Sequence, residues 1–326
     1  MHNVVSGGSI RFASGVLLAA LIVSGAALAA KGGNGGGKGS GGGGGGGGTA
    51  SAARIEGAGD SIMRGYNASC TRNTGLFDFL CYGGGDQAQN SFLDGSSTSV
   101  LSIVDLYLTI DPAATGGKSA SQSGSEMTDP AKNNFATQAN AIVAAATTPV
   151  QVVVELGSND LCNRNSAAEF YTDAEWQAAV DAGLQTLVNG LPNGSTVLLS
   201  SVPRVQDLRA AGIAKQTSDS RVDCEAFWTT FDVCPIATAD DSNYGALELR
   251  QKRYNEILMA RAQVLNADAA STGVEVVAEY QGEFVSSVGT YRFSAREVNG
   301  GDCFHPSIEG QNKLSEMIWN NVFKNR

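Results

Sequence analysis

The feature that most constrains the fold is a regular alternation of short β-branched runs with longer helical patterns. Four apolar runs predict buried strands, at residues 54–58, 151–156, 195–202 and 273–280. Four longer segments have helical spacing, at residues 133–146, 172–189, 244–267 and 307–322. Strands that alternate with helices are joined by βαβ crossovers. The sequence therefore predicts an α/β fold in which helices cover both faces of a central parallel sheet.

The first thirty residues have the layout of an export signal. Arg11 supplies a positive charge, residues 16–29 are mostly apolar, and residues 27–29 read Ala-Leu-Ala, which suits a signal peptidase. An apolar run of about 14 residues is shorter than the roughly 20 that a membrane-spanning helix needs. We expect residues 1–30 to be a cleaved signal peptide and the protein to be secreted or periplasmic, without stable membrane insertion.

Composition separates the rest of the chain into two parts. Residues 31–50 are mostly glycine, which predicts a flexible linker. Residues 51–326 are long enough for one α/β domain. The net charge is −10 and no stripe of Lys and Arg is present, so nucleic acid is not an expected partner. The oligomeric state stays open.

Six cysteines behind an export signal predict disulfides in an oxidising compartment. Six cysteines permit 15 pairings. Proximity in the sequence favours Cys70 with Cys81 and Cys224 with Cys234, which leaves Cys162 for Cys303. Residues 70–129 and 206–241 are polar and irregular, and we interpret them as insertions at a pocket rim, each with a local disulfide. Four aromatic residues in or next to these segments are assigned to local core in preference to pocket walls: Tyr66, Phe92, Phe227 and Trp228.

Polar residues follow the predicted strands at the edge where ligands bind in parallel sheets. Ser61 follows the first strand, Asn159 follows the second, and Asp302 and His305 precede the last helix. His305 is the only histidine outside the predicted signal, because the other is His2.

These residue types suit nucleophilic catalysis. A carboxylate three residues before a histidine can hold the Nδ1 proton and leave Nε2 as a base. The required hydroxyl is that of Ser61, which we expect at the start of a helix whose amides stabilise an oxyanion. The Asn159 amide adds a second donor. The set predicts a Ser61, His305 and Asp302 site that works through an acyl-enzyme.

Three blocks carry a resemblance to a known family: "GDSI" at residues 59–62, "GSNDLC" at 157–162 and "DCFHPS" at 302–307. Together they resemble the SGNH, or GDSL-type, hydrolase superfamily, and the cysteines in the last two blocks are similar to its phospholipase B-like branch. The resemblance implies a flavodoxin-like three-layer α/β/α sandwich and hydrolysis of carboxylic esters without metal or cofactor. By motif position, Ser61 is the nucleophile, Asp302 and His305 are acid and base, and Asn159 lies in the oxyanion hole.

The resemblance also implies an oxyanion hole formed by the amide of Ser61 and by the amide of a glycine. We assign this glycine to Gly124 in "SASQSGSEM", and Gly95 in "NSFLDG" is the rival.

Other chemistries lack the residues they need. A zinc site draws on His and Cys ligands, but one histidine remains and the cysteines are expected to be oxidised. The GxSxG elbow of the larger α/β-hydrolases is absent, and no glycine loop is followed by the Lys and Ser or Thr of a phosphate loop. The sequence therefore favours a secreted serine esterase or lipase acting on a small-molecule or lipid ester, including phospholipids. A polysaccharide acetyl esterase and a non-catalytic surface or carbohydrate-binding protein with the same fold are the alternatives.

Overall fold

The computed structural model describes residues 53–75, 81, 85–281 and 291–324. These residues all belong to one compact unit, Thr49–Arg326. The predicted signal peptide at residues 1–30 and the predicted linker at residues 31–50 lie outside the described residues. None of the helices described is long and apolar enough to cross a membrane.

The centre of the described fold is a parallel sheet of five strands in the order β2-β1-β3-β4-β5. The strands are β1 (Arg54–Gly59), β2 (Thr115–Gly117), β3 (Gln151–Glu155), β4 (Thr196–Leu199) and β5 (Glu275–Ala278). The four predicted strands are all present. β2 was missed because Thr-Gly-Gly is short, largely exposed and at the sheet edge, so it carries no apolar pattern.

The strand register brings the predicted site residues to one edge. Gly59 at the end of β1 is opposite Glu155 at the end of β3. β3 is buried along almost its whole length, as a strand covered on both faces must be. The loops after β1 and β3 therefore leave the sheet side by side.

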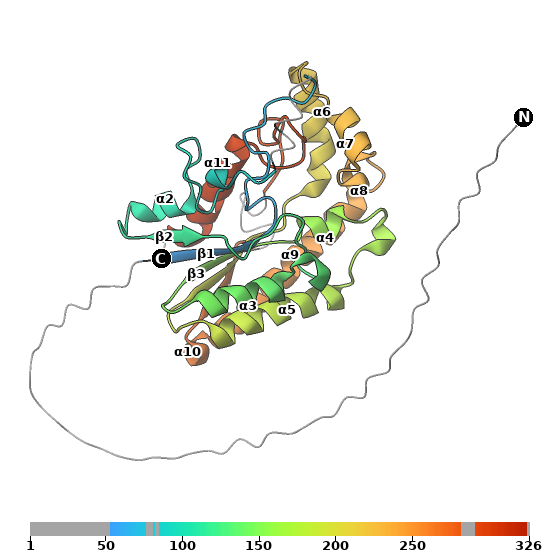
Figure 1. The fold of residues 1–326 in the computed structure, drawn as a ribbon. Helices are drawn as coiled ribbons and strands as arrows, with labels where there is room; N and C mark the ends of the chain where they lie inside the picture. The colour runs from blue at the N-terminus through green and yellow to red at the C-terminus, as the bar shows by residue number, and fades with distance from the viewer. Residues whose placement is uncertain (1–52, 76–80, 82–84, 282–290, 325–326) are drawn as a thin grey trace, which may run out of the picture. The chain divides into compact units, whose positions relative to one another are not determined.

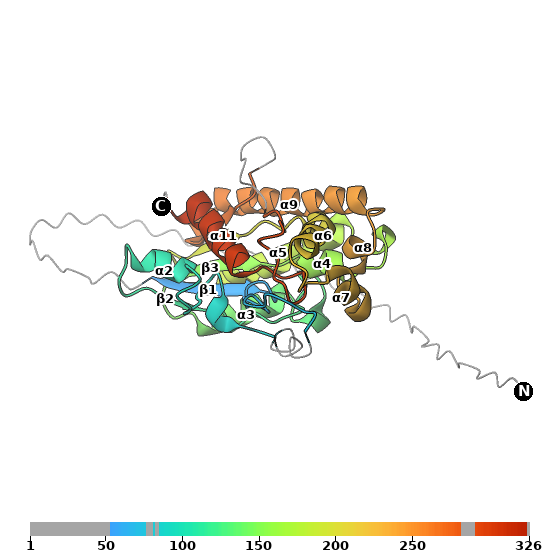
Figure 2. The same ribbon diagram turned by 90° about the horizontal axis from the view of Figure 1, so that it is seen from above.

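Helices cover both faces of this sheet, which confirms the three-layer α/β fold. α5 packs between α3 and α9, and these three lie on one face, whereas α2 and α11 lie on the other (Figures 1 and 2). The helices are α2 (Ile103–Leu108), α3 (Phe135–Ala145), α4 (Ser158–Cys162), α5 (Asp173–Gly190), α6 (Leu208–Ser218), α7 (Cys224–Phe231), α8 (Pro235–Thr238), α9 (Tyr244–Ala267), α10 (Ala269–Thr272) and α11 (Ile308–Ile318).

α5 shows why the local sequence folds as it does. The Thr172 side chain accepts from the Glu175 backbone N–H, and the Glu175 carboxylate accepts from the Thr172 backbone, which forms a capping box. The helix buries Trp176 and Val180 on one face, and the Trp176 ring stacks on Tyr254 of α9 with centroids 3.8 Å apart. Capping thus starts the helix and the apolar stripe fixes it against its neighbour.

The interpretation of residues 206–241 as irregular was wrong. This segment contains α6, α7 and α8, and these helices lie with α4 on the side of the sheet toward which the strands run (Figure 1). The helices are short, and much of α6 and α7 faces solvent, so their apolar spacing is weak. Trp228 of α7 packs against Gly212 of α6, where a larger residue would collide with the indole ring. Residues 70–129 contain α2 and β2 between irregular stretches.

Two of the three predicted disulfides were wrong. The structure contains the Cys70–Cys81 bridge, but it pairs Cys162 with Cys234 and Cys224 with Cys303. Cys224 begins α7 and Cys234 lies beyond its end. A helix of eight residues spans about 12 Å, which exceeds the Cα separation of roughly 7 Å that a disulfide tolerates. The helix between them therefore prevents the local pairing.

Candidate active site

Ser61 lies in the turn that follows β1. The segment after it is a series of hydrogen-bonded turns, in which Arg64 N donates to Asp60 O at 3.2 Å and Tyr66 N donates to Ser61 O at 3.0 Å. The regular helix expected after Ser61 is therefore absent. Gly65 lies within these turns in the left-handed region, with φ of +62°.

A continuous hydrogen-bonded chain joins Ser61, His305 and Asp302. His305 Nε2 lies 2.8 Å from Ser61 Oγ, and His305 Nδ1 lies 2.9 Å from Asp302 Oδ2. Ser61 and Asp302 are buried, and the His305 side chain is 13 % exposed. Residues 244 positions apart in the chain thus meet in the order that proton transfer from a hydroxyl requires.

The Asp302 carboxylate is held by several donors besides the imidazole. Asn67 Nδ2 donates to Oδ2 at 2.9 Å, and Asn299 Nδ2 donates to Oδ1 at 2.8 Å. The backbone N–H groups of Phe304 and His305 also donate to Oδ1, each at 2.9 Å. Burial raises the pKa of Asp302, but the His305 charge and these hydrogen bonds outweigh it, so the pKa lies below its ordinary value.

Two aromatic rings flank the imidazole. The Tyr66 ring lies 4.6 Å from the His305 ring, and the Phe304 ring meets it edge-on at 4.7 Å. The assignment of Tyr66 to local core was therefore wrong, whereas Phe92 and Trp228 are buried core residues. Trp228 Nε1 also donates to Asp302 O at 3.1 Å, so α7 contacts the backbone of Asp302 directly.

The Cys224–Cys303 bridge adds a covalent attachment to the same loop. Cys303 lies between Asp302 and His305 in the left-handed region, with φ of +54°. α7 carries the partner cysteine, and the Cys162–Cys234 bridge connects α8 to α4. The α7–α8 segment is thus attached both to the loop that carries Asp302 and His305 and to the short helix that carries Asn159.

Asn159 contacts the neighbours of both Ser61 and Gly124 in the sequence. Asn159, in α4, donates from Nδ2 to Ser125 O at 2.9 Å and to Asp60 Oδ2 at 3.2 Å. Gly124 precedes Ser125 and has φ of +83° with open space where a side chain would be. No hydrogen bond from the Gly124 amide is present within the part of the chain that the structure describes.

The rival glycine, Gly95, lies in a different setting. Its amide already donates to Ser91 O at 2.9 Å, and a Cβ there would lie 2.5 Å from the same oxygen. The Gly95 amide is therefore already engaged, whereas the Gly124 amide is not engaged by any described residue.

Three buried acids lie beneath this side of the site. Burial raises the pKa of Asp60 to about 6, and burial together with the Asp60 charge raises the pKa of Glu155 well above its ordinary value. Burial raises the pKa of Asp160 to about 7, even though its carboxylate accepts from Met127 N at 2.7 Å and Thr128 Oγ1 at 2.7 Å. Through these bonds Asp160 anchors the segment after Gly124 to α4.

Sequence reasoning missed Asn67, Asn299 and the role of Tyr66. Asn67 lies among turn residues six positions after Ser61, and nothing in that spacing distinguishes it from an ordinary turn asparagine. Asn299 had a usable signal, because an asparagine three residues before Asp302 in a Gly-rich loop can cap the turn. Its Oδ1 does accept from Gly301 N and Asp302 N, each at 2.8 Å.

Comparison with protein families decides what kind of protein carries this arrangement. The model of the family described as GDSL-like Lipase/Acylhydrolase matches residues 55–318, which is most of the chain.

The chain belongs to the GDSL-like lipase and acylhydrolase family.

As a member of this GDSL-like family, also called SGNH, the protein is an ester-hydrolysing enzyme. The alternative hypothesis of a non-catalytic surface or carbohydrate-binding protein is therefore rejected. No comparison places it in the phospholipase B-like branch. No curated protein sequence matches the chain.

Solved structures with a similar fold include esterases and a lipase. An extracellular lipase from Streptomyces rimosus has 14% identity and a TM-score of 0.43, with 83% of this chain and 100% of that chain covered. An inhibitor-bound aryl esterase of M. smegmatis has 14% identity and a TM-score of 0.42, with 84% and 99% covered. A carbohydrate esterase has 13% identity and a TM-score of 0.43, with 83% and 68% covered.

Proposed function

We propose that the protein is an exported serine esterase that hydrolyses acyl esters through Ser61, His305 and Asp302. The observation that carries the proposal is the hydrogen-bonded chain from Ser61 Oγ to His305 Nε2, at 2.8 Å, and from His305 Nδ1 to Asp302 Oδ2, at 2.9 Å. This arrangement is the one in which a neutral imidazole removes the hydroxyl proton while a carboxylate fixes its tautomer.

The reaction proceeds in two halves. Ser61 Oγ attacks the ester carbonyl carbon while its proton moves to His305 Nε2. The tetrahedral intermediate then collapses, the bond to the alcohol oxygen breaks, and Nε2 returns the proton to that oxygen. Water attacks the acyl-enzyme in the same way, losing a proton to Nε2, and Ser61 regains a proton as the carboxylic acid leaves. Asp302 stays ionised and stabilises the imidazolium of each step.

The oxyanion of both intermediates is stabilised by three donors. The backbone amides of Ser61 and Gly124 have no acceptor among the described residues. The Asn159 amide donates to Ser125 O and Asp60, so it must turn one N–H from these oxygens toward the oxyanion. A side-chain donor of this kind contributes about 3 kcal/mol to the transition state.

Export is the second part of the proposal. The first thirty residues have the composition of a signal peptide. The three disulfides are typical of proteins that fold in the periplasm or outside the cell. Cleavage near residue 30 would leave the glycine-rich segment as a linker before the enzyme domain.

Hydrolysis of p-nitrophenyl esters from acetyl to palmitoyl, by the mature protein and by Ser61→Ala, tests the proposal. We expect Ser61→Ala to lose about 10⁴-fold or more in kcat/KM. Activity confined to acetyl esters would favour a polysaccharide acetyl esterase, and activity extending to long chains would favour a lipase. Full activity in Ser61→Ala would contradict the proposed nucleophile.

A further inference from the structure

A cavity lies next to the loop that carries Asp302 and His305. Its volume is about 550 Å³, within the range of small-molecule sites. Its walls come from residues 68–71, residues 215–221 and both sides of the catalytic loop, at 295–300 and 307–309. Ser61, Asn159, Asp302 and His305 do not line it. The cavity is therefore distinct from the proposed ester site.

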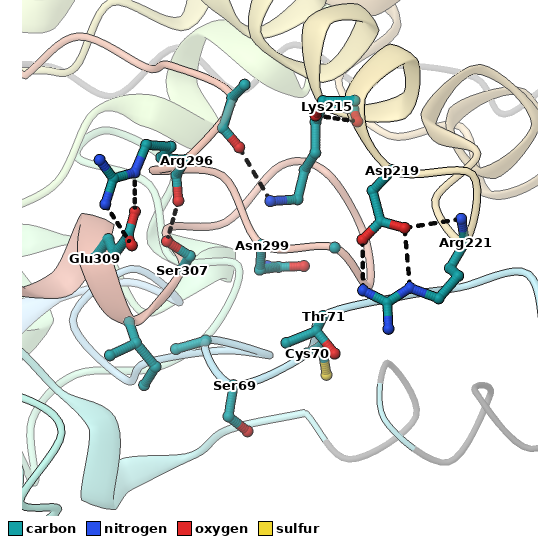
Figure 3. A pocket seen from close by; sticks show the side chains of 15 residues that line it. Ser69, Cys70, Thr71, Lys215, Asp219, Arg221, Arg296, Asn299, Ser307 and Glu309 are labelled. Carbon is teal, nitrogen blue, oxygen red and sulfur yellow. Dashed lines mark hydrogen bonds and ion pairs between the residues drawn. The ribbon is translucent and has the colours of Figure 1, made fainter.

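Lys215 is the cation at the centre of this cavity. Figure 3 shows its chain descending from α6 and its ammonium pointing into the space between two ion pairs. The ammonium donates to Ala295 O at 3.0 Å, and no carboxylate in the described residues lies within ion-pair distance of it. Burial lowers the pKa of Lys215, and the charges of Asp219 and Glu309 offset this shift only in part.

The acids near Lys215 are neutralised by other cations. Asp219 pairs with Arg221 at 2.7 Å, and Glu309 pairs with Arg296 at 2.9 Å. The wall thus carries three cations and two anions, and Lys215 supplies the uncompensated charge. A negative ligand group would meet this charge with one of the three ammonium hydrogens already engaged by Ala295 O.

The remaining wall combines an apolar part with the polar residues Ser69, Thr71, Ser218, Asn299 and Ser307. Ala68, Ala295 and Ile308 line the cavity together with Cys70, whose sulfur is in the disulfide with Cys81. A ligand that places an anionic group on Lys215 would therefore lay a short apolar body on these side chains. A free inorganic ion would leave this surface uncovered.

We propose that this cavity binds a small organic anion, with its carboxylate or phosphate oxygens on the Lys215 ammonium and a short apolar body against Ala68, Ala295 and Ile308. This site is additional to ester hydrolysis and does not depend on the role of Ser61.

The site adjoins the residues that position the acid. Asn299 lines the cavity, and its Nδ2 donates to Asp302. Ala68 follows Asn67, the second amide on Asp302, and its carbonyl accepts from Ile308 N at 3.1 Å. A bound anion would therefore lie beside Asn299 and one residue along the chain from Asn67, the two side-chain amides that hold the Asp302 carboxylate.

Titration of the isotope-labelled mature protein, followed through its backbone amide resonances at constant ionic strength, tests the site. The probes are butyrate, butyl phosphate and butyramide, which share an apolar chain and differ in charge. We expect one or both anions to shift the amides of Thr71, Gly300 and Ile308, with little effect of butyramide. The anion that binds with the higher affinity shows whether the site prefers a carboxylate or a phosphate group.

Variants of Lys215 separate a built site from general attraction to the surface. Lys215→Met should weaken the binding of the anion at least about tenfold, because a charge-assisted hydrogen bond is lost. Lys215→Arg should retain binding, and Lys132→Met, which removes an exposed lysine outside the cavity, should leave it unchanged. Equal binding of butyramide, unchanged affinity in Lys215→Met, or shifts confined to Gly124 and Asn159 would overturn the proposal.

Discussion

The two sides of Ser61 are held in different ways. On the acid–base side, Asp302 accepts hydrogen bonds from two asparagine amides, two backbone amides and the imidazole, and Cys303 is bound to α7. On the oxyanion side, Gly124 faces open space, and its amide has no acceptor among the described residues.

In the proposed mechanism the two sides have different tasks. The imidazole must keep one ring orientation and one tautomer, so a rigid carboxylate is useful in every step. The oxyanion donors must admit a carbonyl oxygen that arrives with the substrate, so their positions before binding are less restrained. Substitutions on the two sides should therefore fail in different ways.

Asp302→Asn should have the largest effect. The amide replaces the carboxylate that accepts from His305 Nδ1, so the imidazole is held in the wrong tautomer, and kcat/KM should fall by about 10⁴. Steady-state kinetics with a p-nitrophenyl ester measures this loss, and circular dichroism checks that the variant folds. A loss below about tenfold would show that Asp302 does not orient the base.

Asn159→Ala should lower kcat by about 10²–10³ with little change in KM, because the donor acts on the transition state. Asn163→Ala is a matched control in the same region, since its amide binds Glu126 at 2.8 Å and does not face Ser61. Kinetics of both variants on one ester measures the difference. Equal losses in the two would attribute the effect to local structure.

Asn67→Gly should lower kcat by roughly tenfold, because one charge-assisted hydrogen bond to Asp302 is lost. Glycine is the suitable replacement, since Asn67 has φ of +52° and alanine would add backbone strain. KM should stay near the wild-type value if Asn67 only positions the acid. A rise in KM at unchanged kcat would instead indicate contact with substrate.

Gly124→Ala and Gly95→Ala distinguish the two candidate glycines. At Gly124 a methyl group meets no atom, so the cost of about 1–2 kcal/mol is conformational and displaces the amide, which should reduce kcat about tenfold. At Gly95 the methyl group collides with backbone, so the melting temperature should fall while kcat of the folded enzyme is retained. The reverse pattern would assign the oxyanion role to Gly95.

Glu155→Gln should have the smallest effect on activity but a measurable effect on stability. Because the native pKa of Glu155 is raised, the native state holds a proton that the unfolded chain releases above the ordinary carboxyl pKa. The native state then binds more protons, so stability falls as pH rises. As the pH rises from ~4.5 to 7, the free energy of unfolding of the variant should therefore increase relative to that of the wild type, as measured in urea titrations. A difference in the free energy of unfolding that does not change with pH would show that Glu155 does not hold this proton in the native state.

The strands and main helices could be predicted because burial leaves a pattern in the sequence. β3 is a β-branched run because both its faces are covered, and α5 begins at a Thr172 and Glu175 capping box. β2 and the helices α6 to α8 could not be found in this way, since an exposed edge strand and short solvent-facing helices carry little apolar periodicity.

The site could be predicted as far as its motifs extend. Ser61, Asn159, Asp302 and His305 follow strand ends or precede the last helix, so the parallel topology alone brings them to one edge. The disulfide partners could not be derived, because they depend on where α7 and α8 lie in space. The roles of Asn67 and Tyr66 could not be derived either. Their contacts with Asp302 and His305 depend on how the turns after Ser61 fold in space.

Labelling with a fluorophosphonate, followed by peptide mapping in a mass spectrometer, tests the central claim most directly. The account predicts one adduct, on Ser61, that forms rapidly in the wild type and far more slowly in His305→Ala, because the imidazole removes the hydroxyl proton. An adduct on another serine, or labelling of Ser61 at the same rate without His305, would contradict it.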